Sequence, residues 1–180
     1  MKIKRIFTGL AIILLTAMIS IMLLGCASPR AIRKEFDPYT LNQNGTYKIC
    51  VATEDTPWKQ EVISMVAIEL GSSYSLQVEN LRFLEEIQTG EWDAVLVIST
   101  FYAFGLQSDT EAFLSELQEK ENIILLVTSA ISDLGDYGVS AVTAASIGKT
   151  KEDARSLTPK REPEGVAAEI AQIIKDKVQQ

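Results

Sequence analysis

Hydrophobic and polar positions along residues 46–178 fall into blocks that predict strands separated by helices. Two runs, Asp93 to Ser99 and Ile123 to Thr128, are almost continuously apolar, which is typical of parallel strands covered on both faces. Shorter β-rich runs predict three more strands, at Tyr47 to Thr53, Ser75 to Leu81 and Gly138 to Thr143. The pattern therefore predicts five strands, of which the last is the weakest.

Helices are predicted between most of these strands and after the last one. Thr56 before Pro57 is typical of an N-cap followed by the first helical position, and Gly71 is placed to end that helix. Ser108 with Glu111 three residues later has the pattern of a capping box. We expect helices over residues 57–70, 82–88, 108–120 and 163–178, the last of them clearly amphipathic.

The alternation of strands and helices predicts an α/β fold, a three-layer sandwich around a mostly parallel five-stranded sheet. The layout resembles a small flavodoxin-like domain with strand order 2-1-3-4-5 over residues 46–178. The segment 129–137, between the fourth and fifth strands, is close to the minimum for a parallel crossover. We therefore expect either a fourth helix reduced to a turn or a fifth strand that runs antiparallel at the edge.

The amino-terminal segment has the composition of a signal peptide. Three basic residues within the first five positions precede the uncharged, apolar stretch Ile6 to Leu24. The run that follows, Leu23-Leu24-Gly25-Cys26, resembles the lipobox of bacterial lipoproteins, which implies cleavage before Cys26 and a diacylglyceryl thioether on its sulfur. The alternative is an uncleaved signal anchor, because the apolar stretch nearly reaches the roughly 20 residues that span a bilayer.

The lipobox interpretation divides the chain into a signal peptide (1–25), a lipidated tether (26–45) and a flavodoxin-like domain (46–180). It implies an extracytoplasmic protein that is anchored to a cell membrane or outer membrane by its acyl chains. Cleavage would change the net charge from −7 to −10, which argues against nucleic-acid binding because phosphate contacts need clustered Lys and Arg. Cys50 would remain as the one thiol, so no internal disulfide is expected.

In open α/β sheets, ligands bind beyond the carboxyl ends of the strands, where the strand order reverses. Flavodoxins bind FMN there, so the resemblance implies a possible FMN site in the loops after the first and third strands. Glu54 and Asp55 conflict with this, because two carboxylates would face a phosphate; in the alternative interpretation, Thr56 and these acids only cap and favour the helix start. The candidate cofactor-binding residues are Thr53, Thr56, Lys59, Ser99, Thr100, Phe101 and Tyr102.

Hydroxyl groups also follow the fourth and fifth strands, at Thr128, Ser129, Thr143 and Ser146. They could form a polar rim for an anion, a sugar or a peptide, or they could simply terminate strands and cap helices. The segment 140–146 also resembles the flavinylation motif of extracytoplasmic FMN-bearing domains, except that Ser140 replaces the leading Asp. That resemblance implies Ser146 as a covalent FMN acceptor, whereas the alternative is a closely packed edge strand.

Catalytic candidates are few. The chain has no His, which removes Ser-His and Cys-His catalysis and the commonest metal ligand. Cys50 lies in the middle of a predicted strand, where a buried structural thiol is expected. A Ser nucleophile with Lys59 as base remains conceivable, but no Gly-x-Ser-x-Gly motif occurs. We therefore predict no catalytic or metal-binding residues, and a membrane-anchored module that binds a ligand or a protein partner of the envelope; the alternative is an FMN-carrying electron-transfer protein.

Overall fold

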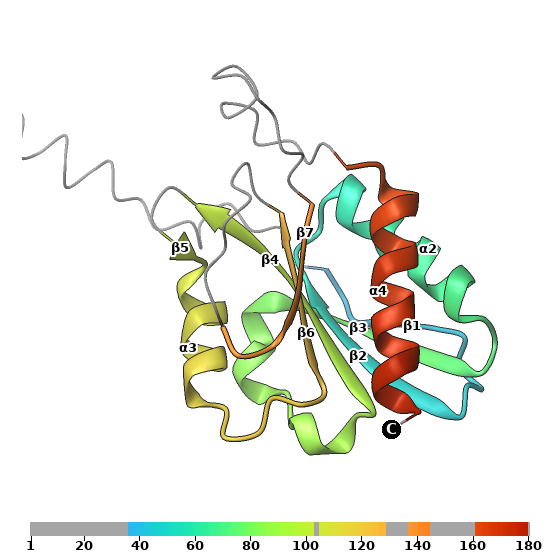
Figure 1. The fold of residues 1–180 in the computed structure, drawn as a ribbon, viewed down its shortest axis with the longest axis horizontal. Helices are drawn as coiled ribbons and strands as arrows, with labels where there is room; N and C mark the ends of the chain where they lie inside the picture. The colour runs from blue at the N-terminus through green and yellow to red at the C-terminus, as the bar shows by residue number, and fades with distance from the viewer. Residues whose placement is uncertain (1–35, 103–104, 129–136, 145–160, 180) are drawn as a thin grey trace, which may run out of the picture. The chain divides into compact units, whose positions relative to one another are not determined.

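The computed structural model of the chain describes residues 36–102, 105–128, 137–144 and 161–179 (Figure 1). Cys26, Ser129 and Ser146 lie outside these ranges, and so does the predicted signal peptide. Within the described ranges, no helix combines the length and apolar character needed to cross a bilayer.

A central sheet organises the domain. Its strands are, in spatial order, β1 (Tyr39–Leu41), β3 (Tyr74–Asn80), β2 (Tyr47–Thr53), β4 (Ala94–Tyr102), β6 (Ile123–Thr128) and β7 (Ser140–Thr143). All neighbouring pairs from β3 to β7 are parallel. The five strands predicted from the sequence thus lie in the order 2-1-3-4-5, which confirms the flavodoxin-like α/β fold. The fifth of them, β7, runs parallel to β6. The expected alternative, an antiparallel strand at the edge, is therefore wrong.

Two short strands that the sequence did not predict add antiparallel pairs to this sheet. β1 pairs with β3, with Tyr39 opposite Val78, and β5 (Gly105–Leu106) pairs with the end of β4. The Tyr39 hydroxyl also donates a hydrogen bond to the Gln60 side chain on the following helix. The folded domain therefore extends further towards the amino terminus than the expected start near residue 46, and it includes part of the expected tether.

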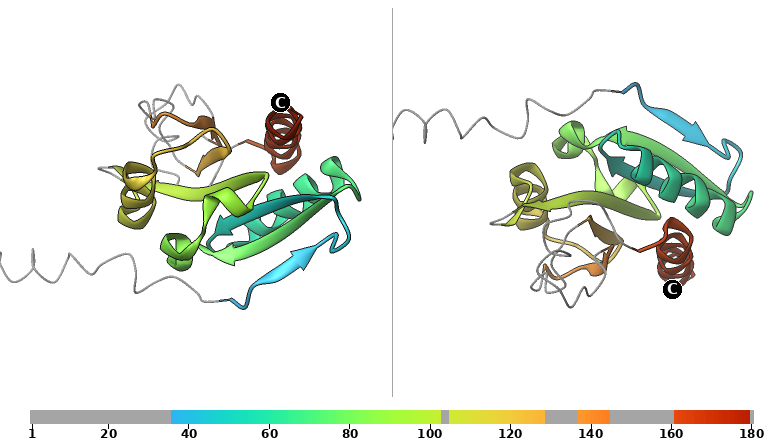
Figure 2. Two further views of the ribbon diagram at one scale, coloured as in Figure 1. Left: turned by 90° about the horizontal axis from the view of Figure 1, so that it is seen from below. Right: turned by 90° about the horizontal axis from the view of Figure 1, so that it is seen from above.

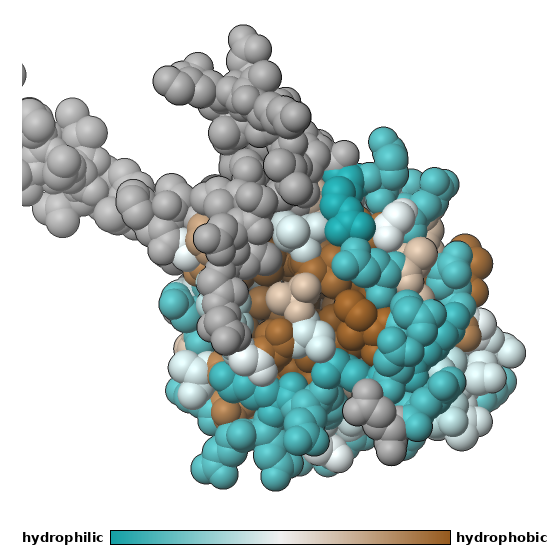
Figure 3. All heavy atoms as spheres, in the orientation of Figure 1, coloured by the Kyte–Doolittle hydropathy of each residue, from teal (hydrophilic) through white to brown (hydrophobic). Residues whose placement is uncertain are grey.

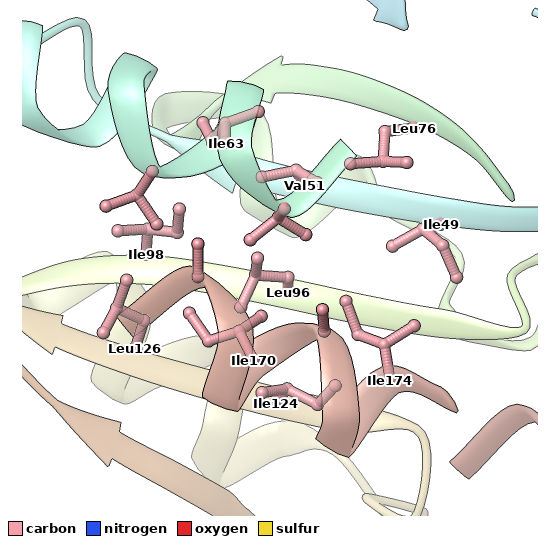
Figure 4. Packing of buried hydrophobic residues seen from close by; sticks show 14 of the residues in the cluster. Ile49, Val51, Ile63, Leu76, Leu96, Ile98, Ile124, Leu126, Ile170 and Ile174 are labelled. Atoms are coloured by element: carbon pink, nitrogen blue, oxygen red, sulfur yellow. The ribbon is translucent and has the colours of Figure 1, made fainter. Parts of the chain in front are cut away.

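One face of the sheet is covered by α2 (Pro57–Leu70) and α4 (Pro163–Val178), whose bounds match the prediction. Thr56 caps α2 by accepting a hydrogen bond from the Lys59 amide, and Gly71 ends the helix with a φ of 75°, a value that favours glycine. Figure 4 shows Ile170 and Ile174 of α4 directed at the apolar side chains of the sheet. This is the larger apolar core of the described domain.

The opposite face is covered by α3 (Ser108–Glu116) and two 3₁₀ helices, η2 (Leu81–Glu86) and η3 (Thr89–Glu91), as the two views of Figure 2 show. The short helical stretch predicted over 82–88 is present as the 3₁₀ helix η2. The predicted capping box is wrong: the N-cap position is Gln107, without a side-chain cap, and the Ser108 hydroxyl bonds to Asp109 instead. α3 ends near Glu116 rather than near residue 120.

Burial of both sheet faces explains why the central strands are so apolar. All six residues of β6 are buried, and so are residues 94–99 of β4. On the face that Figure 3 shows, hydrophobic residues gather over β6 and β7, and hydrophilic residues surround them. The polar residues Ser99, Thr100 and Thr128 follow these apolar runs near the carboxyl ends of β4 and β6.

Candidate functional site

The candidate site lies at the carboxyl ends of β2 and β4, where the strand order reverses. Glu54 directly follows β2, and Lys59 lies in the first turns of α2. The Lys59 ammonium is 2.7 Å from Glu54 Oε2, and the two side chains are only 3% and 12% exposed. The loop and the helix start together produce this contact, because the chain turns at Thr56 and carries Lys59 back over the end of β2. We call this place, where the carboxyl ends of β2 and β4 meet and the strand order reverses, the switch point. It therefore contains a buried ion pair.

Glu54 also receives hydrogen bonds from more distant parts of the chain. Thr100, at the end of β4, donates to Glu54 Oε2 at 3.1 Å, and its hydroxyl accepts from the Lys59 ammonium at 3.0 Å. The Gln107 amide nitrogen, just before α3, donates to Glu54 Oε1. Three donors from three elements thus surround one carboxylate.

The electrostatic consequence is a carboxyl group held in its charged form. Burial raises the pKa of Glu54, but the positive charge of Lys59 and the hydrogen bonds from the three donors outweigh burial. The net result is a pKa below the ordinary value of 4.5. Glu54 is therefore an anion at neutral pH, paired within the protein.

A chain of hydroxyl groups continues from this carboxylate along the edge of the sheet. The Thr100 and Thr128 hydroxyls are 3.1 Å apart, and Thr128 donates to the Ser99 carbonyl oxygen at 3.2 Å. The Ser99 hydroxyl is 2.8 Å from that of Thr110 in α3. The hydroxyls predicted at the strand ends of β4 and β6 do come together, but they bond to groups within the protein, namely Glu54, the Ser99 carbonyl oxygen and the Thr110 hydroxyl, rather than forming an open rim.

The other predicted residues have local roles or lie outside the described ranges. The Thr53 hydroxyl donates to the Glu54 carbonyl oxygen at 3.2 Å, and Thr56 caps α2. Phe101 is half-buried against the core on the α3 face. Tyr102 pairs with Gly105 through its backbone. Ser146, the candidate flavin acceptor, lies outside the described residues, and the prediction for it stays open.

These observations test whether the switch point fits the phosphate of FMN, the cofactor that this strand order suggests. The Lys59 ammonium and the Thr100 hydroxyl, which could bind a phosphate, are both bonded to Glu54. The hydroxyls of Thr53 and Thr56 are used by neighbouring backbone groups. A phosphate placed here would also meet the charged carboxylate of Glu54. The residues present therefore do not fit a flavin phosphate.

Gln107 is the residue of this site that sequence analysis missed. It is almost fully buried, and it contacts Glu54 although 53 positions separate the two residues in the sequence. A lone Gln in front of a predicted helix gives no signal of such a role. The contact depends on the antiparallel pairing of β5 with the end of β4, which brings the start of α3 back towards the end of β2.

Neither a metal centre nor a reactive thiol is found in the described part of the chain. Its His, Cys, Asp and Glu side chains form no cluster of three suited to a metal ion. Cys50 is fully buried in β2, and burial together with the charge of Glu79 raises its pKa to about 12. Its thiol is therefore protonated and inert, as expected for a structural cysteine.

No protein-family model matches the chain, and no curated protein matches it. Among solved structures, it is similar to an oxidoreductase from Corynebacterium diphtheriae, with 16% identity, a TM-score of 0.46 and coverage of 72% of this chain and 97% of that one. It is also similar to the flavodoxin of Streptococcus pneumonia TIGR4, with 16% identity, a TM-score of 0.42 and coverage of 73% and 98%. The flavodoxin-like assignment itself rests on the strand order.

Proposed function

We propose that the protein is an extracytoplasmic lipoprotein, anchored to a membrane through Cys26, whose flavodoxin-like domain is a non-catalytic binding module for a ligand or an envelope partner. The observation that favours this binding module over a flavoprotein is the buried pair of Glu54 and Lys59. It places an anion of the protein where a flavodoxin-like fold would place an anion of its cofactor.

The energetics of this pair favour a switch point in which Lys59 stays paired with Glu54 over one in which an external anion replaces Glu54. To admit a phosphate, the site would have to expel the Glu54 carboxylate or hold two anions together. Separating a buried pair leaves an uncompensated charge, at a cost of about 3–5 kcal/mol. Lys59, Thr100 and Gln107 already satisfy Glu54, so nothing on the protein side offsets that cost.

A charge-removal experiment tests this assignment. In Glu54→Ser, the Lys59 ammonium, the Thr100 hydroxyl and the Gln107 amide lose their shared acceptor and become donors for an external anion. We expect inorganic phosphate to raise the melting temperature of Glu54→Ser saturably and to leave that of the wild type unchanged. The double variant Glu54→Ser/Lys59→Met is the matched control, and it should lose the response. An equal phosphate response in the wild type would contradict the proposal.

The membrane anchor is supported by the sequence before the folded domain. Leu23-Leu24-Gly25-Cys26 has the lipobox pattern, and acyl chains on one cysteine hold a protein at a bilayer because each buried CH₂ contributes about 0.8 kcal/mol. Intact mass after expression in a bacterial host tests it. We expect the wild type to lose residues 1–25 and to gain a diacylglyceryl group, and Cys26→Ala to keep its full length. A wild-type chain with an unprocessed amino terminus would rule out the anchor.

The alternative function, an FMN-carrying electron-transfer protein, makes a different prediction for the same samples. Covalent flavin on Ser146 would add the mass of FMN to the mature chain. Non-covalent flavin at the switch point would require the site to open at Glu54. The first outcome is visible in the same mass measurement, and the second in the absorption spectrum described in the Discussion.

A further inference from the structure

A cavity of about 680 Å³ lies on the α3 face of the sheet, away from the switch point. Its floor is formed by β2 and β3, and its walls by η2, η3 and the segment before β1. The residues that line it are Phe36, Asp37, Pro38, Cys50, Glu79, Phe83, Glu86, Ile87, Gln88, Glu91 and Trp92. Its volume falls within the range of about 300–1,000 Å³ that is typical of small-molecule sites.

The cavity exists because this part of the sheet has a thin cover. Along β3, Leu76 and Val78 are buried in the core under α2, whereas Gln77 and Glu79 alternate to the other face and are only half-buried. Where a doubly wound fold has room for a full helix, this chain has the short helices η2 and η3. They leave Glu79 of β3 open to the cavity.

The described residues that line the cavity carry charge of one sign. Four of them are acidic, Asp37, Glu79, Glu86 and Glu91, and none of the described lining residues is basic. The acidic residues come from four different parts of the chain, the segment before β1, β3, η2 and η3, and among the described residues they form no cluster of three that could hold a metal ion. The negative charge of Glu79 reaches the floor, where it adds to burial in raising the pKa of Cys50. Such a cavity attracts a ligand with several separated positive charges.

Aromatic side chains supply the second half of the recognition chemistry. Phe36, Phe83 and Trp92 line the cavity together with Ile87. Phe83 is 37% exposed and is one of two large hydrophobic residues that are exposed in the described part of the domain. The Arg82 guanidinium lies 5.0 Å from the centre of the Phe83 ring, so one face of this ring is already in a cation–π contact and a ligand can meet only its other face and its edge. Aromatic faces beside carboxylates suit ammonium groups joined by methylene chains.

We propose that this cavity binds a small aliphatic polyamine, a linear cation with two or more ammonium groups. The proposal rests on the binding role proposed above, and it names the ligand class and a site distinct from the switch point. Glu79 at the floor and Glu91 at the rim contact separate ammonium groups, and Phe83 and Trp92 pack against the methylene chain between them.

Calorimetric titration of the full chain in detergent with spermidine, at 150 mM salt, tests the proposal. We expect saturable one-to-one binding, and Glu79→Gln/Glu91→Gln should weaken it about tenfold, since each exposed ion pair contributes up to about 1 kcal/mol. Glu85→Gln is the matched control, because Glu85 is an exposed acid of η2 that does not line the cavity; it should leave the affinity unchanged. No binding by the wild type, or equal losses in both variants, would overturn the proposal.

A second variant tests the aromatic contribution without altering charge. Phe83→Leu keeps an apolar wall and should weaken spermidine about threefold through loss of the cation–π contact, whereas the fold, followed by circular dichroism, should not change. An unchanged affinity would overturn the role assigned to Phe83. Tighter binding of pentalysine than of spermidine would show that the partner is a basic peptide and would overturn the small-ligand class. Neither result bears on the phosphate test at Glu54, so the two proposals fail separately.

Discussion

The Lys59 ammonium lies 2.7 Å from the Glu54 carboxylate at the carboxyl edge of the sheet, and both side chains are almost fully removed from solvent. In a flavodoxin-like fold, this edge is where a cofactor anion is expected. The protein here supplies both charges itself. We therefore expect the stability of the domain to depend on this pair.

Removal of Lys59 should destabilise the domain strongly. Lys59→Met leaves the Glu54 carboxylate buried without its cation, and we expect a loss of about 3 kcal/mol in the free energy of unfolding, measured in urea. Glu169→Gln is the control, because it breaks the exposed pair with Arg161 and should cost less than about 1 kcal/mol. The double variant Lys59→Met/Glu54→Leu should recover most of the loss. A loss below about 1 kcal/mol for Lys59→Met would contradict a buried, coupled pair.

The same pair predicts a loss of stability in acid. The pKa of Glu54 is lower in the folded chain than its ordinary value of 4.5, so the folded state favours the charged carboxylate. This contribution is fully present above pH 4.5 and is lost as the pH falls through the folded pKa. In urea unfolding at several pH values, the difference between the wild type and Glu54→Gln should be largest at neutral pH and should narrow below about pH 4.5. A constant difference down to pH 2.5 would show that Glu54 does not titrate in this way.

Gly45 should be intolerant of any side chain. It follows the turn after β1, where its amide donates to the Asn42 carbonyl oxygen at 3.0 Å. A Cβ atom there would lie 2.3 Å from the backbone of Tyr74 and Ser75. Gly45→Ala should therefore destabilise the domain by about 2 kcal/mol or more. Gly90→Ala is the control, since a Cβ at Gly90 meets nothing within 4 Å. Equal stability of the two variants would mean that the segment between β1 and β2 is not packed against β3 as described.

Cys50 should resist modification in the native protein. Its thiol is fully buried, and its pKa is raised to about 12, so almost no thiolate forms at pH 8. After treatment with iodoacetamide, peptide mass analysis should find Cys50 unmodified in the native chain and fully alkylated in urea. Native alkylation at a rate near that of the denatured chain would show that β2 is accessible from the cavity side.

Much of the fold could be predicted from the sequence because burial on both faces leaves a strong pattern. β6 is apolar throughout and is buried at every position, and α2 is bounded by Thr56 and Gly71, whose local chemistry is visible in the sequence. β1 was missed because three residues near Pro38 and Asn42 form a strand only through pairing with the distant β3. The capping box at Ser108 failed because the chain enters α3 one residue earlier, at Gln107.

The position of the candidate site was also predictable, since strand order determines where the loops after β2 and β4 meet. The contacts that the side chains make at this site could not be predicted from the sequence. Glu54 and Asp55 look equivalent in sequence, yet the pair with Lys59 forms through Glu54, which is largely buried. Gln107 reaches Glu54 only because β5 turns the chain back after β4. Such contacts depend on tertiary packing, and no local pattern records them.

The central claim, that Glu54 occupies the place of a cofactor anion, is tested most directly by an absorption spectrum from 350 to 500 nm. The full chain is isolated from its native membrane and measured before and after incubation with excess FMN and removal of free flavin. We predict a colourless protein in both cases, and no flavin released on denaturation. A yellow protein, or stoichiometric retention of added FMN, would contradict the account and would identify the domain as a flavoprotein.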